Sequence, residues 1–208
     1  MCTVGRPSVS LLDTERITTA ALALVADSGG FTIPLLAKKL GVSPSSLYNH
    51  VSGREEIVEL LRERAMSEVA LPGHGLDWRE TVAQIARAYR DSYARYPRLI
   101  PLLTEHAVNS AHAFGMYNAL ADALSAADFG PADVLNIITV LDSFVLGSAL
   151  DLAAPEAPWR PSVEVGRALR AALDTASSKS SRSDEAFEYG LRALLAGFDP
   201  VASDELDG

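Results

Sequence analysis

Apolar residues recur along most of this chain at intervals of three and four, the spacing that places side chains on one face of an α-helix. The first such run follows Asp13, a favourable helix cap, and ends at Gly29-Gly30. Its predicted inner face consists of Ile17, Ala20, Ala21, Leu24 and Val25. No stretch of useful length alternates as a half-buried β-strand does, so the pattern predicts an all-α fold.

Residues 32 to 51 predict two short helices joined by a turn at Leu40-Gly41-Val42. Ser43 can cap the second helix, and Pro44 follows at the first helical position, where its missing N–H costs nothing. The predicted solvent-facing side chains form hydrogen bonds and include no acid: Ser45, Ser46, Tyr48, Asn49 and His50. Such a surface suits the major groove of DNA, although a helical hairpin with a polar outside fits the same pattern.

The clearest break in the chain is the segment 71–75, which reads Leu-Pro-Gly-His-Gly. The helix before it is predicted to open with a capping box formed by Ser52 and Glu55. We therefore expect two domains, residues 1–71 with an N-terminal arm and residues 72–208. The second domain is predicted to contain helices over 77–96, 98–110, 112–127, 132–154, 162–176 and 184–198, with a flexible loop at 177–183.

Composition is that of a globular protein, with 48% hydrophobic and 22% charged residues. Charge or helix punctuation interrupts the apolar runs before the roughly 18 residues of a membrane span, so no membrane partner is expected. Cys2 is the single cysteine, which excludes an intrachain disulfide, and the chain does not open with a signal-peptide pattern. These features favour a cytoplasmic protein.

The net charge of −9 is unusual for a protein that binds DNA through phosphate contacts. The distribution of charge weakens this objection, because residues 1–71 have a net charge of −1 and residues 72–208 a net charge of −8. The acidic excess therefore lies outside the predicted DNA-reading segment. We expect modest non-specific affinity for DNA and a shallow dependence on salt.

Residues 13–70 resemble the tetracycline-repressor (TetR) family of bacterial transcription regulators. The resemblance is carried by the helix ending at Gly29-Gly30, Phe31-Thr32, the segment 36–43, the segment 46–51, and Arg54 with the following apolar helix. Beyond residue 75 the helix count agrees, and residues 141–150 look like the long helix near the dimer seam of tetracycline repressors. The resemblance implies an all-α homodimer with an N-terminal three-helix helix-turn-helix DNA-binding head and a C-terminal helical core for effector binding and dimerisation.

By this resemblance, Thr32, Tyr48, His50 and Arg54 are expected to contact phosphates, and Ser45, Ser46 and Asn49 to face the bases. Arg6 in the arm is a further expected DNA contact, in the neighbouring minor groove. Pro34 and Pro44 replace side chains that read bases in many relatives, so the operator sequence is not predicted. The expected function is that of a repressor released from a palindromic double-stranded DNA operator by a small-molecule effector.

An effector pocket is expected among the helices of residues 77–152. Its predicted lining residues are Trp78, Tyr89, Tyr93, Leu103, His106, Met116, Tyr117, Asn136, Thr139 and Phe144. Aromatic side chains with a few polar groups suit a hydrophobic or planar ligand, although each aromatic residue also fits plain core packing. The dimer is expected to form from residues 134–152 and 185–198 of both copies, with the small residues Gly147, Ser148 and Ala149 allowing close approach.

Two other classes of protein stay open. One is a helical small-molecule- or partner-binding protein that no longer binds DNA, which the acidic charge and the two prolines favour. The other is an all-α enzyme whose site is assembled from scattered residues. The chain contains no phosphate-binding glycine loop, zinc-protease motif or nucleophile elbow, so no catalytic residue, metal site or cofactor is predicted. His106 and His112 do not have the spacing that would place both imidazoles together on one helix turn.

Overall fold

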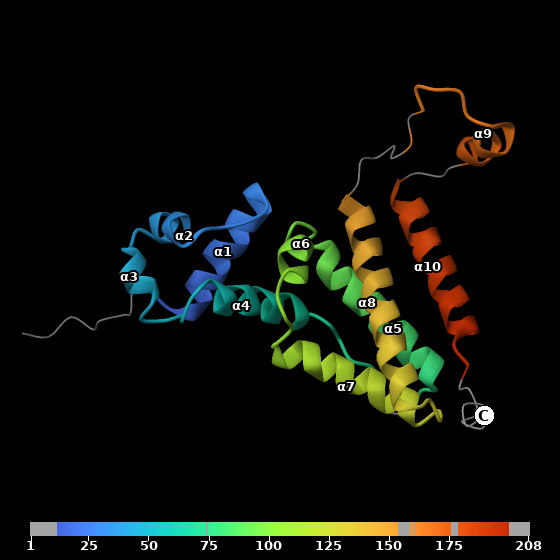
Figure 1. Ribbon diagram of the computed structural model, residues 1–208, viewed down its shortest axis with the longest axis horizontal. Helices are drawn as coiled ribbons and strands as arrows, with labels where there is room; N and C mark the ends of the chain where they lie inside the picture. Colours follow the sequence, from blue (N-terminus) through green and yellow to red (C-terminus); the bar gives the residue numbers. More distant parts are fainter. Residues whose placement is uncertain (1–11, 74, 154–158, 160, 176–178, 200–208) are drawn as a thin grey trace, which may run out of the picture. The chain divides into compact units, whose positions relative to one another are not determined.

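The computed structural model describes residues 12–73, 75–153, 159, 161–175 and 179–199. Within these residues the chain is all-helical, with ten helices and no strand, as the sequence pattern predicts (Figure 1). The helices are α1 (Thr14–Ser28), α2 (Ile33–Leu40), α3 (Pro44–Leu47), α4 (Arg54–Met66), α5 (Trp78–Ala94), α6 (Leu99–Thr104), α7 (Ala111–Ser125), α8 (Pro131–Ala153), α9 (Arg167–Asp174) and α10 (Lys179–Gly197).

The first compact unit, which we call the head, comprises Met1–Met66 and Arg98–Ala113. It contains α1 to α4, the short helix α6 and the first residues of α7. Asp13 caps α1 by accepting a hydrogen bond from the backbone N–H of Arg16 at 2.8 Å, and Gly29 ends the helix in the left-handed conformation at φ 78°. The buried apolar faces of α1, α2 and α4 form the head's core, with Ile17, Leu36 and Ile57 fully buried.

The second unit, which we call the core, comprises Ser67–Pro97 and Phe114–Gly208. Within it α5 and α8 pack against each other, and α10 lies beside α8 (Figure 1). The buried residues of α8 recur at intervals of three and four and face α5: Val134, Ile137, Leu141, Val145 and Ala149. The predicted domain boundary after residue 71 lies close to the end of the head's first segment, but the head also takes residues 98–113 from the predicted second domain.

Several predicted boundaries need correction. The predicted helix over 98–110 ends at Thr104, and α9 spans only Arg167–Asp174. The predicted loop at 177–183 is wrong for its described part, because α10 already begins at Lys179. The predicted capping box also uses a different acid: the backbone N–H of Ser52 donates to Glu56 at 2.6 Å, not to Glu55. This hydrogen bond lowers the pKa of Glu56.

The sequence pattern also predicted that no apolar run is long enough to cross a membrane, and α8 contradicts this prediction. Residues 131–152 are long and apolar enough, by length and composition alone, to cross a membrane, with a mean hydropathy of 1.6. In this fold the helix packs on α5, and Asp142 on α8 accepts a hydrogen bond from the Tyr117 hydroxyl at 2.9 Å. These contacts place one side of α8 against α5 and Tyr117.

Candidate nucleic-acid interface and effector core

The outer surface of α3 and of the turn that follows it is exposed as predicted. Ser45, Tyr48, Asn49 and His50 are exposed, while Leu47 and Val51 behind them are buried. The α-helix itself is a single turn, Pro44–Leu47, and the backbone N–H groups of His50 and Val51 both donate to the carbonyl of Leu47. We call the exposed residues 45 and 48–50 the reading face.

Ser43 organises the start of this surface. Its Oγ accepts from the backbone N–H of Ser46 at 3.3 Å, as a helix cap does, and lies 2.8 Å from the hydroxyls of both Ser45 and Ser46. Ser46 is half-buried. The two serines expected to face bases therefore have hydroxyls that already interact with Ser43. Tyr48, Asn49 and His50 have the larger exposed polar side chains of the reading face.

Thr32 is exposed at the start of α2 and caps this helix, since its Oγ1 accepts from the backbone N–H of Leu35 at 3.3 Å. A hydroxyl that accepts one hydrogen bond can still donate another, so Thr32 remains able to donate to a phosphate. The next backbone N–H of the first turn is also paired, since Leu36 donates to the carbonyl of Thr32 at 2.9 Å, and Pro34 has no N–H. Lys38 and Lys39 are exposed in the last turn of α2.

Arg54 makes contacts within the head that the sequence did not reveal. Its Nη1 donates to the carbonyl of Phe31 at 2.8 Å, and its guanidinium lies 4.8 Å from the centre of the Phe31 ring. This contact joins the start of α4 to the loop before α2. The predicted phosphate contact of Arg54 stays a prediction, and Arg6 lies outside the described residues.

A row of charged side chains on α4 holds the segment 103–112, and sequence reasoning missed it. The buried Arg62 donates to Glu59 at 3.0 Å and, through Nη2, to the carbonyls of Leu103 at 3.0 Å and His106 at 3.2 Å. Glu59 also accepts from the backbone N–H of Asn109 at 2.8 Å. The only sequence signal was an arginine inside the apolar face of α4, between Leu61 and Ala65.

Glu63, one position after Arg62, accepts hydrogen bonds from the Ser110 hydroxyl and from the backbone and ring nitrogen of His112. Burial alone would raise the pKa of Glu63, but these hydrogen bonds hold it below its usual value. The end of α6 and the start of α7 are thus attached to α4 through polar contacts. Among the described residues no group of three or more His, Cys, Asp or Glu side chains could hold a metal ion.

The predicted effector residues divide between the two units. Leu103 and His106 belong to the head, and the other eight belong to the core. Tyr89 and Tyr93 are buried in α5 as an edge-to-face pair with ring centres 5.3 Å apart, and Trp78 packs edge-on against Phe129 at 5.1 Å. Met116 is buried, and Tyr117 donates to Asp142. These positions fit both core packing and a ligand-lined interior, so the pocket stays a prediction.

Asn136, Thr139 and Phe144 lie elsewhere on the core. Asn136 and Thr139 are exposed, and Phe144 is half-buried with its ring stacked on Phe187 at 5.3 Å. Thr139 and Phe144 line an apolar groove between α8 and α10, together with Val140, Ser143, Gly190, Ala193 and Leu194. These residues lie on the face that the sequence analysis assigns to dimerisation, rather than among the buried aromatic residues of α5.

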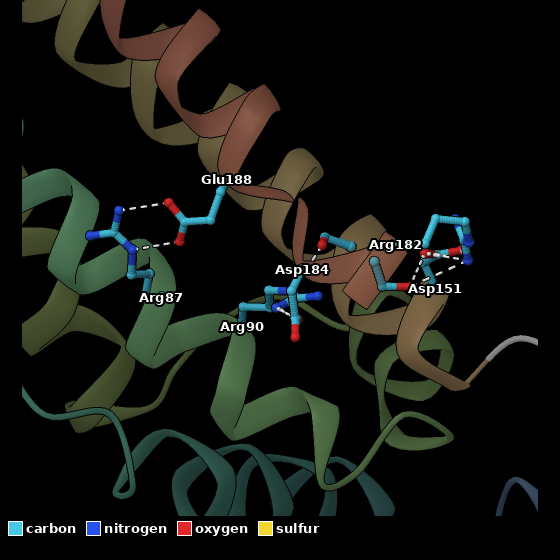
Figure 2. Close-up of polar contacts among 8 residues, drawn as sticks. Arg87, Arg90, Asp151, Arg182, Asp184 and Glu188 are labelled. Atoms are coloured by element: carbon cyan, nitrogen blue, oxygen red, sulfur yellow. Dashed lines mark hydrogen bonds and ion pairs between the residues drawn. The ribbon is translucent and has the colours of Figure 1, made fainter. Parts of the chain in front are cut away.

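Ion pairs hold α10 against α5 and α8 (Figure 2). Arg87 forms two hydrogen bonds with Glu188, at 2.7 and 2.8 Å, and the buried Arg90 donates to Asp184 at 2.7 Å and to Ser148 at 2.9 Å. Near the start of α10, Arg182 and Ser183 donate to Asp151. Arg87 lowers the pKa of Glu188, and Ser183 lowers the pKa of Asp151. We call these residues the α10 ion-pair cluster.

Of the three small residues predicted for a close dimer contact, only Gly147 is exposed. Ala149 is fully buried within the core, and Ser148 accepts the hydrogen bond from Arg90. The exposed apolar side chains nearby lie elsewhere on the two helices: Leu135, Val140 and Leu150 on α8 and Tyr189 on α10.

Comparison with known proteins agrees with this architecture. The family described as tetracyclin repressor-like, C-terminal domain, matches residues 71–201. An HTH-type transcriptional regulator of Saccharopolyspora erythraea is 29% identical over 75% of this chain and 66% of its own length. The class D tetracycline repressor protein of Escherichia coli is 26% identical over 90% of this chain and 89% of its own length.

Among solved structures, a possible TetR family transcriptional regulator from Streptomyces coelicolor A3(2) superposes with a TM-score of 0.75 at 25% identity. The superposition covers 89% of this chain and 98% of that protein. The fold, the helix-turn-helix head and the match of the family to residues 71–201 therefore agree, and the chain belongs to the tetracycline-repressor family of transcriptional regulators.

Proposed function

We propose that this protein is a cytoplasmic, dimeric repressor that binds a palindromic DNA operator and releases it when a hydrophobic or aromatic small molecule fills its core. The observation that carries this proposal is the reading face, which is exposed and polar over a buried apolar support. Fold neighbours give further support: BioQ of Mycobacterium smegmatis was solved with its double-stranded DNA operator, and ActR of Streptomyces coelicolor with actinorhodin.

On DNA, the phosphate contacts would come from Thr32, Tyr48, His50 and Arg54, and the base contacts from Ser45, Ser46 and Asn49. Phosphate contacts set the register of a protein on the duplex, whereas base contacts specify sequence. Because Ser43 engages both serine hydroxyls, Asn49 is the side chain on which base discrimination depends most. Its amide can form the paired hydrogen bonds that distinguish adenine.

Dimerisation through α8 and α10 would cover the exposed apolar side chains of these helices. Leu135 is 65% exposed and Tyr189 is 72% exposed, on helices that also line an apolar groove. A second copy related by a two-fold axis presents the same surface in return. The paired heads would then reach half-sites about one helical turn, ~34 Å, apart.

Release would follow from coupling between the effector core and the head, typically ~1–3 kcal/mol. The chain connects the units at three places, after α4, before α6 and within α7, which begins in the head and continues in the core. Arg62 and Glu63 attach the residues around these connections to α4. A shift of the segment 98–113 can therefore be transmitted to the reading face through α4.

The proposal is tested by selecting duplexes that the wild-type protein binds from a random pool and measuring the variants on them. Tyr48→Ala is expected to weaken binding to all selected duplexes alike. Asn49→Ala is expected to lose about 1–3 kcal/mol of discrimination at one base pair of each half-site.

Failure to select any duplex would contradict the DNA-binding function and favour a helical protein that binds only small molecules or partners. A uniform loss of affinity in Asn49→Ala would contradict its role in base reading while leaving DNA binding intact.

A further inference from the structure

Arg98, at the cap of α6, reaches a helix far from it in sequence. Its Nη1 donates to the carbonyl oxygens of Ala26 at 2.9 Å and Asp27 at 2.7 Å, in the last turn of α1. A cation with N–H donors is favoured there, because the last carbonyls of a helix lack partners and carry the negative end of its dipole. The last turn of α1 has no basic residue of its own, so Arg98 supplies one from α6.

The segment after this turn contains two adjacent glycines, Gly29 and Gly30. Gly29 adopts the left-handed conformation, and a Cβ added at either glycine would meet no atom within 4 Å. No side chain packs against these two positions, whose backbone is held by the hydrogen bonds of the Gly29 N–H to Val25 at 2.8 Å and of the Ser28 hydroxyl to the Gly30 carbonyl at 3.0 Å. Glycine has the most backbone freedom of any residue. Thr32 follows two residues later, so its position relative to α1 depends on other contacts.

Arg54 supplies such a contact on the far side of the glycine pair. Its hydrogen bond to the carbonyl of Phe31 fixes the residue directly before Thr32. Guanidinium groups from two helices, Arg98 before α6 and Arg54 on α4, thus hold the backbone on both sides of Gly29-Gly30.

Arg62 in turn fixes α6. It donates to the carbonyls of Leu103 and His106 at the end of this six-residue helix, whose side chains Leu99 and Ile100 are buried. The start of α6 is therefore joined to α1 by one arginine, and its end to α4 by another. A displacement of α6 would therefore strain its contacts with both α1 and α4.

We propose that Arg98 is a positioning residue for operator binding, because it fixes the last turn of α1 and thereby the place of Thr32 at the DNA-facing start of α2. This inference rests on the proposed function, in which Thr32 contacts a phosphate. It gives α6 a second connection to the DNA-facing surface, separate from the contacts made through Arg62 and Glu63 on α4.

The test compares full-length Arg98→Met, Arg98→Lys and Thr32→Ala, and the double variant of Arg98→Met with Thr32→Ala, on a duplex selected by the wild-type protein. Arg95→Met is the matched control, since Arg95 lies three residues earlier and pairs with Glu68 in the core. Hydrogen exchange of the amides of residues 26–33 without DNA is measured on the same proteins, together with their thermal unfolding.

Arg98→Met is expected to weaken operator binding about two- to fivefold, the range of a cation at a helix C-terminus, and to speed exchange in residues 26–33. Arg98→Lys keeps the charge and should recover part of both effects, while Arg95→Met should change neither. Because Arg98 acts through Thr32, the double variant should bind no more weakly than Thr32→Ala alone.

Additive losses in the double variant, or unchanged affinity in Arg98→Met or in Thr32→Ala, would overturn the inference. If no duplex can be selected, the proposed function fails, and the exchange measurement decides separately whether Arg98 holds the segment. If the amides of residues 26–33 exchange at wild-type rates in Arg98→Met, the claim that Arg98 holds this segment is overturned as well.

Discussion

A single oxygen atom, Oγ of Ser43, joins three residues at the start of α3. It accepts from the backbone N–H of Ser46 and lies at hydrogen-bond distance from the hydroxyls of Ser45 and Ser46. A hydroxyl has one proton and two lone pairs, so these contacts use its full capacity. Ser43 therefore acts both as a helix cap and as the residue that orients the side chains of Ser45 and Ser46.

Replacing Ser43 tests this double role. Ser43→Ala is expected to lower the free energy of unfolding by about 1 kcal/mol, the usual value of a lost helix cap. Ser45→Ala should cost less, because its hydroxyl caps no backbone N–H. Urea unfolding of both variants measures the difference, and equal losses would contradict the special role of Ser43.

Gly190 provides a second test at the scale of one residue. A Cβ at this position would lie 2.6 and 2.8 Å from ring atoms of Phe144. Gly190→Ala should therefore displace this ring from its stack on Phe187 and lower the free energy of unfolding by about 1–3 kcal/mol, as overpacking does. Thermal unfolding of Gly190→Ala measures this loss. A second substitution, Phe144→Leu, should reduce the penalty of Gly190→Ala in the same measurement.

At the scale of elements, ion pairs as well as apolar packing hold α10 in place. The contacts of the α10 ion-pair cluster come from α5, α8 and α10, and the guanidinium of Arg90 also lies 4.6 Å from the centre of the Phe187 ring (Figure 2). Glu188 and Asp151 are partly exposed, so solvent weakens their individual contributions. The cluster as a whole fixes the position of a helix that we expect at the dimer seam.

The lowered pKa values of Glu188 and Asp151 predict a response to acid. Each carboxylate binds protons more weakly in the folded chain, so its stabilisation is present above the unfolded pKa and lost as the pH falls through the folded one. The free energy of unfolding of the wild type should decline as the pH falls below about 4.5. Chemical denaturation at several pH values should show a smaller decline in Glu188→Gln, and an equal decline would refute this origin.

Which elements exist could be predicted from the sequence, whereas some of their boundaries could not. Asp13 and Ser43 cap α1 and α3 as their positions in the sequence predict, because capping is local chemistry. The capping box predicted for Ser52 was wrong by one residue in its acid, because α4 begins at Arg54 and its third residue is Glu56. The serine-rich start of α10 has the composition of a loop, but Arg182 and Ser183 gain partners on α8 that no local pattern reveals.

At the scale of the whole molecule, chain order does not determine which unit a segment joins. The head recruits residues 98–113 from the middle of the sequence, through contacts of Arg62, Glu63 and Arg98 that span 41 to 72 positions. Such pairs leave no periodic signal, which explains why the sequence pattern predicted the reading face but missed the contacts that attach residues 98–113 to α1 and α4. The exposed polar side chains of that face could be found because they interrupt a local apolar pattern.

The proposed dimer can be tested with a charge on its predicted seam. Leu135→Arg is expected to produce a monomer in analytical ultracentrifugation at micromolar concentration, since a buried unpaired cation is costly. Leu35→Arg is the matched control, because Leu35 is 50% exposed but lies in the head. A dimer that persists in Leu135→Arg would show that the dimer interface does not include this side of α8.

The exposed side of α8 also has a consequence for how the protein accumulates in a cell. A newly made copy exposes Leu135, Val140 and Leu150 on a helix whose hydropathy matches that of a lipid-embedded segment. The proposed pairing would cover this side, and the stability of a dimer of this kind depends on the concentration of its chains. Scarce unpaired copies would then be substrates for chaperones and proteases, so the rate of synthesis itself would set a threshold below which little working regulator accumulates.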